Sequence, residues 1–233
     1  MKRALFLVAS GLCFFGFAYT QYLIFYVAPL QGLYDPDLSN PLFFNQKIFY
    51  YHVPCAFVLL IAVMICGVAS FRYLRGRNPE QDDIAAACAE LAVLFGAVMC
   101  VTGSIWAKAA WEKWWVWDLR LTTSLILWMT MVGYVLVRKY GGPGSERLGA
   151  GLAALASVAV PFVYFSVKIQ RTLHPQTSVV PGLQGEQRTA FWSSVLLFIV
   201  FFVLLLRVRI DAIRSHRRVE IVREQGLDAG LFE

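Results

Sequence analysis

Residues 48–71 read IFYYHVPCAFVLLIAVMICGVASF, a stretch with no lysine, arginine, aspartate or glutamate. A helix needs about 20 predominantly apolar residues to cross the hydrocarbon core of a bilayer, so this stretch predicts a transmembrane helix. The whole chain agrees with it, being 58% hydrophobic and only 15% charged, with a mean hydropathy of +0.59. These values indicate a polytopic membrane protein.

Five more apolar stretches of similar length accompany this one. Lipid offers the backbone no hydrogen-bond partners, so stretches of this length predict helices and an all-α, six-helix transmembrane bundle. The first stretch follows Lys2 and Arg3 like a signal peptide, but it is too long for a signal core and is expected to stay as a helix. No repeat or linker divides residues 1–233, which are expected to form one integral membrane domain. The predicted spans are residues 4–30, 48–71, 85–106, 121–137, 148–167 and 190–206.

Basic residues are distributed unevenly between the connections. With the amino terminus inside, fourteen Lys and Arg fall on the cytoplasmic side and seven on the other side. The positive-inside rule then places both termini in the cytoplasm, including the basic tail 207–233, which either lies along membrane lipid or is a solvated flank. The net charge of +6 therefore reflects topology and does not indicate nucleic-acid binding.

The outer connection between the third and fourth spans, residues 106–120, is rich in tryptophan. If residues 111–118 are helical, three indoles and one carboxylate share a face, which suits a large flat ligand. The alternative is an interfacial aromatic belt, but four Trp in seven positions followed by an acid favour a ligand surface. The residues concerned are Trp106, Trp111, Trp114, Trp115, Trp117, Asp118 and the adjacent Arg120.

The chain has only three histidines, and two of them fall on the same outer side. His52 lies near the outer end of the second span, His174 follows the fifth span, and His216 is in the tail. A single such histidine is often a helix-packing residue. Two imidazoles near an aromatic surface fit the axial positions of a heme iron, whereas zinc needs three or four protein ligands. The five cysteines form no C-x-x-C pair and indicate no metal site.

These segments resemble a known family. Residues 106–123, WAKAAWEKWWVWDLRLTT, resemble the tryptophan-rich WWD signature of heme-handling proteins. Residues 51–54, YHVP, and 172–175, TLHP, resemble the two histidine segments of the cytochrome c maturation protein C family of heme exporters. Family members commonly have Gly after the first Trp of the motif, where this chain has Glu112 followed by Lys113.

The resemblance implies a binding and transfer protein and not an enzyme. Such a protein holds heme b noncovalently on the outer face of the bacterial inner membrane and presents it to a periplasmic heme chaperone. It works beside an ABC-type ATPase and permease and a small single-span subunit. By matching position, His52 and His174 would be the axial ligands and residues 106–120 the WWD segment.

Two other classes share some of these features. Synthases or lyases that attach heme to apocytochrome thiols resemble the chain in the WWD motif, but they have more spans, additional histidines and usually a sizeable outer domain. A b-type electron carrier would normally need a second heme near the inner face, where the chain offers only His216. Heme stoichiometry distinguishes the carrier from the heme handler.

Overall fold

The computed structural model describes residues 3–29, 43–170, 172–176 and 178–229, which contain helices and no strand. Six helices are long and apolar enough to cross a membrane, which confirms the predicted all-α, polytopic class. Residue 30, where the first predicted span ends, and residues 230–233 of the tail lie outside the described residues. The helices are α1 (Arg3–Tyr22), η1 (Leu23–Val27, a π-helix), η2 (Phe43–Ile48, a 3-10 helix), α2 (Phe49–Gly76), α3 (Pro79–Trp111), α4 (Leu119–Tyr140), α5 (Ser145–Ile169), α6 (Val179–Gly182) and α7 (Gly185–Asp228).

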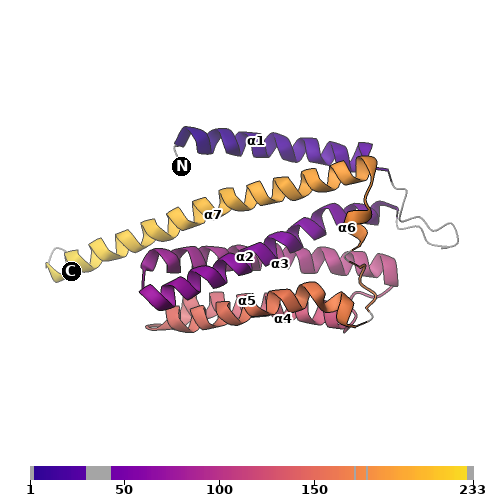
Figure 1. Cartoon of the computed structure of the whole chain (residues 1–233). Coiled ribbons are helices and arrows are strands. Elements are labelled where there is room, and N and C mark those ends of the chain that lie inside the picture. Colours follow the sequence, from indigo (N-terminus) through magenta and orange to yellow (C-terminus); the bar gives the residue numbers. More distant parts are fainter. Residues whose placement is uncertain (1–2, 30–42, 171, 177, 230–233) are drawn as a thin grey trace.

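The spanning helices alternate in direction, so both described ends of the chain lie at the same end of the bundle (Figure 1). Helices α2 to α5 form the packed centre, α7 lies against α2 and α3, and α1 packs mainly against α7. The connection 112–118 and the short helix α6 lie at the opposite end. The described part of the tail continues α7, which runs without a break from Gly185 to Asp228.

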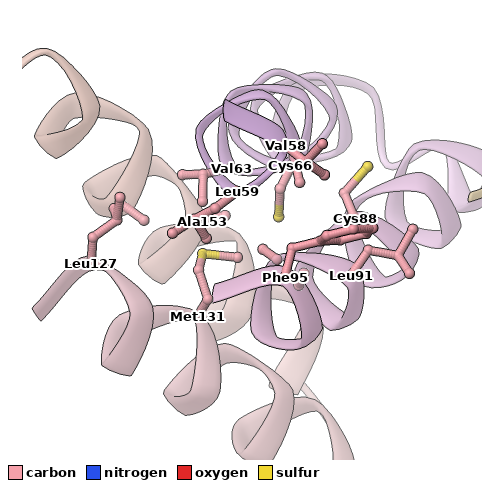
Figure 2. Close-up of a cluster of buried hydrophobic side chains, with 14 of the residues drawn as sticks. Val58, Leu59, Val63, Cys66, Cys88, Leu91, Phe95, Leu127, Met131 and Ala153 are labelled. Atoms are coloured by element: carbon pink, nitrogen blue, oxygen red, sulfur yellow. The ribbon is translucent and has the colours of Figure 1, made fainter. Parts of the chain in front are cut away.

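The core is built mainly from apolar side chains of α2, α3, α4 and α5, with Phe202 of α7 packed among them (Figure 2). Water does not drive helices together inside a membrane, so close backbone approach and dispersion contacts carry much of the association. Gly67 on α2 is such a contact, since a Cβ there would lie 2.5 Å from the Cβ of Ser157 on α5.

Ion pairs at the first turns of α3 hold the end of the bundle that carries the termini. Asp82 accepts a hydrogen bond of 2.5 Å from Arg138 on α4. Asp83, almost fully buried, accepts two from Arg217 on α7, at 2.9 and 2.8 Å. One acidic pair therefore fastens α3 to two neighbours.

Pro54 lies inside α2 and has no N–H to donate to the carbonyl four residues earlier, that of Tyr50. A buried carbonyl without a partner is costly in a membrane. Ser194 of α7 supplies the missing donor, because its hydroxyl donates to the Tyr50 carbonyl at 2.5 Å and its side chain is fully buried. This bond fixes α7 against α2 within two turns of His52.

Ser194→Ala should therefore lower the stability of the detergent-solubilised protein by about 1–2 kcal/mol, because the Tyr50 carbonyl loses its donor. In a Pro54→Ala background the backbone regains an N–H at position 54, and the same substitution should cost less than half as much. Thermal unfolding measures both, with the adjacent Ser193→Ala as control. Equal losses in the two backgrounds would contradict the compensation.

Candidate functional site

Residues 112–118 of the tryptophan-rich segment form a loop, so the condition for a shared indole face, a helix over residues 111–118, is not met. Helix α3 ends at Trp111 because Glu112 adopts a left-handed conformation, with φ 59° and ψ 11°. Asp118 then starts α4 as its N-cap, in extended geometry, and accepts a hydrogen bond from the Leu121 N–H at 2.8 Å. A capping aspartate cannot sit inside a continuous helix. The shared helical face proposed for the indoles does not exist.

Glu112 stands where the resemblance of the motif predicts Gly, and it adopts the left-handed conformation that Gly favours. The Lys108 ammonium donates to the Glu112 carbonyl at 3.1 Å and so satisfies one group at the end of α3. The turn expected of Gly is therefore made here by a glutamate.

The tryptophans of residues 106–117 form two edge-to-face pairs, one at the end of α3 and one in the loop. Trp106 packs against Trp111 with ring centroids 5.3 Å apart, and Trp115 packs against Trp117 at 5.9 Å. Trp114 and Trp117 are 60% and 77% exposed, so their rings are available to a ligand or a partner. The Trp115 indole N–H is buried and has no hydrogen-bond partner within the described part of the chain.

His52 is held on α2 with one ring nitrogen engaged. Its Nδ1 lies 3.0 Å from the Met99 carbonyl and 3.2 Å from the Thr102 hydroxyl oxygen, both on α3. A carbonyl only accepts, so Nδ1 carries the proton and donates, and in the neutral ring Nε2 then keeps its lone pair. Gly103 makes room for the ring, because a Cβ there would lie 2.8 Å from His52 Cε1.

His174 adopts the same tautomer in a different setting. Its Nδ1 lies 2.9 Å from the Pro175 carbonyl, and its backbone N–H donates to the Thr172 hydroxyl at 3.0 Å. Burial, and secondarily the positive charge of Arg120, lowers the pKa of His174 below its ordinary value. The imidazole is thus neutral near pH 7, as a metal ligand must be.

His52 lies in the first turn of α2 and His174 follows the end of α5, so both lie at the end of the bundle where α2 begins and α5 ends. The positive charge of Arg120, at the start of α4, acts on His174. Arg120 donates to the Val163 carbonyl of α5 and is partly buried. Both carboxylate oxygens of Asp118 are engaged elsewhere, by the Leu121 N–H and by the Thr172 hydroxyl.

Three site residues escaped the sequence analysis: Thr102, Gly103 and Thr172. A local signal existed for Thr172, since a threonine two residues before a backbone N–H commonly accepts its hydrogen bond. Thr102 and Gly103 lie on α3 and meet His52 only through packing of α3 on α2. No local pattern identifies them.

The model of the family described as heme exporter protein C matches residues 6–226. The chain belongs to the heme exporter protein C family. Among its relatives, the heme exporter protein C of Bradyrhizobium diazoefficiens is 30% identical over 83% of this chain and 74% of its own. That of Escherichia coli is 30% identical over 70% and 69%. A putative cytochrome c biosynthesis ccmC-like mitochondrial protein of Marchantia polymorpha is 29% identical over 74% and 70%.

The side chains at this end of the bundle fit heme. Two neutral imidazoles keep Nε2 available, as two axial ligands require. An orphaned indole N–H on Trp115 and the guanidinium of Arg120 are donors suited to propionates. The exposed rings of Trp114 and Trp117 can cover a flat apolar edge.

Gly103→Ala should displace the His52 ring, because the added methyl would lie 2.8 Å from Cε1 at a helix interface. Overpacking of this kind costs about 1–3 kcal/mol, which corresponds to roughly 5- to 150-fold weaker heme retention. Heme per purified chain measures the effect. Gly133→Ala is the control, since nothing lies within 4 Å of a Cβ built there; equal retention in both variants would contradict the role of Gly103.

Proposed function

We propose that the chain binds heme b noncovalently through His52 and His174 and presents it at the outer face of the bacterial inner membrane to the heme chaperone of cytochrome c maturation. Family membership already gives it a role in heme export for that pathway. The observation that carries the proposal is the matched pair of tautomers. Both histidines bind a protein carbonyl through Nδ1 and leave Nε2 for iron.

The orientation follows from charge and helix direction together. Both described ends of the chain lie at the end of the bundle that carries most of the basic residues, which favours the cytoplasm for that end. The histidines and the WWD loop, residues 112–118, then face the periplasm. Heme supplies the iron and porphyrin, and the side chains of this loop would bind its edge.

Holding and transferring heme requires no covalent chemistry from the chain. Axial bonds to imidazole are reversible, so a receiving chaperone with its own ligand can compete for the iron. This is the behaviour of a heme-handling component rather than of an enzyme. It differs from a lyase, which must form thioether bonds to an apocytochrome.

The partners we propose are the ABC-type ATPase and permease and a small single-span subunit. Helix α1 supports a transmembrane partner, because it packs mainly on α7 and leaves a broad apolar surface uncovered. Phe14 and Phe15 on α1 are 72% and 69% exposed. Lipid or a second helix must cover such a surface in the membrane.

Replacing either His52 or His174 with Ala should remove one axial ligand, so the spectrum should shift from six-coordinate low-spin to five-coordinate heme or lose heme intensity. His216→Ala is the matched control, because its side chain is 77% exposed on the tail. Acid-acetone extraction should remove the heme and give one per chain. Unchanged spectra in both outer variants would refute bis-histidine ligation, and two hemes per chain would indicate an electron carrier.

Trp114→Ala and Trp117→Ala should impair the delivery of heme to the chaperone more than the binding of heme. Both rings are exposed, and neither of them holds the histidine nitrogens that we propose as iron ligands. We expect heme per purified chain to fall by less than half, and covalent heme on the chaperone to fall several-fold. The two quantities are measured side by side. Trp192→Ala is the control, because Trp192 is an exposed tryptophan on α7. If Trp114→Ala and Trp117→Ala transfer heme at the wild-type level, the rings of Trp114 and Trp117 are an interfacial belt and not part of the delivery surface.

A further inference from the structure

Asp118 connects the WWD loop to the segment that carries His174. One carboxylate oxygen accepts the Leu121 N–H at 2.8 Å and caps α4. The other accepts the hydroxyl of Thr172. That hydroxyl oxygen in turn accepts the His174 backbone N–H at 3.0 Å. Two hydrogen bonds therefore run from Asp118 through Thr172 to the backbone of His174.

We infer that Asp118 and Thr172 are positioning residues that fix the His174 imidazole, and that the Asp118 carboxylate does not itself bind heme. This inference rests on the proposed function, in which His174 ligates the iron. The sequence pattern predicts that Asp118 belongs to the aromatic ligand surface. In the structure its carboxylate instead binds the Leu121 N–H and the Thr172 hydroxyl.

Electrostatics supports the same assignment. An ionised carboxylate only accepts hydrogen bonds, and both oxygens of Asp118 already have donors. Heme propionates are also anionic, so a carboxylate beside them would repel them. The nearby cation, Arg120, and the free indole N–H of Trp115 are better suited to that role.

Among the described residues, the backbone around His174 has few other anchors. Pro175 follows it and has no N–H, and the described partner of the His174 Nδ1 is the neighbouring Pro175 carbonyl. That local bond orients the ring relative to its own backbone and not relative to the bundle. The link to Asp118 is what ties this segment to the start of α4, and α4 packs on α5 in the core.

Thr172→Val, which keeps the shape and removes the hydroxyl, tests the link in the full-length heme-loaded protein. We expect a five-coordinate high-spin fraction by electron paramagnetic resonance, and heme loss to apomyoglobin roughly three- to tenfold faster, as expected for one lost hydrogen bond. Thr172→Ser should behave as wild type. Asp118→Asn, which still caps α4 but loses the acceptor for Thr172, should resemble Thr172→Val.

Thr189→Val serves as the matched control, because in the described structure its hydroxyl bonds within α7, to the Gly185 carbonyl at 3.3 Å.

The inference is overturned if Thr172→Val keeps the wild-type spin state and the wild-type rate of heme loss while His174→Ala loses its iron ligand. It is also overturned if Thr172→Val and Asp118→Asn slow only transfer to the chaperone, which would make them partner contacts. If His174→Ala itself changes nothing, the proposed ligand is wrong, and this separate result identifies the proposed function as the failure. If Thr172→Val does not fold, Asp118→Asn is compared with Thr172→Ser instead. The same two measurements, the spin state and the rate of heme loss, then decide the question.

Discussion

Every polar backbone group within the hydrocarbon region must find its partner inside the protein, and the architecture follows from that constraint. It makes the six spans helical, and it explains the bond from Ser194 to the carbonyl that Pro54 leaves free. At the end of the first span the Lys47 ammonium donates to the Ala28 carbonyl at 2.7 Å, and this side chain is buried. Irregular backbone is confined to the ends of the bundle, where the site is built.

At the candidate site, the hydrogen bonds that fix the tautomer of each imidazole matter more than any preformed shape of a pocket. Each imidazole is oriented by an acceptor on its Nδ1, one in a helix interface and one in a loop. The interface fixes His52 tightly, since Gly103 leaves room for the ring and for little more. His174 is held by a short chain of polar groups. The two candidate ligands thus differ in rigidity, and the loop side is the one a partner can reach.

Apolar length was enough to predict the spans, because burial in lipid leaves few alternatives to a helix. Helical spacing failed for residues 111–118, where the capping preference of Asp118 and the left-handed Glu112 override periodicity. The two histidines were identifiable because the outer connections contain no others. Their supports were not, since Thr102, Gly103 and Ser194 act on residues tens of positions away in the chain, and only packing brings them there.

Helix α7 has a mechanical consequence of its own. Its 44 residues form one rod about 66 Å long, roughly twice the thickness of the hydrocarbon core. Ser194 attaches it near the end that carries the WWD loop, and Asp83 binds Arg217 near the other end. Between these contacts α7 also packs on α2 and α3, and Arg209 pairs with Glu90. Because the rod is long, a tilt of about 5° about the Asp83–Arg217 pair would move the end at Gly185 by roughly 4 Å. Force applied to the projecting end of α7 would therefore reach the α2 turn that carries His52 without any change in secondary structure.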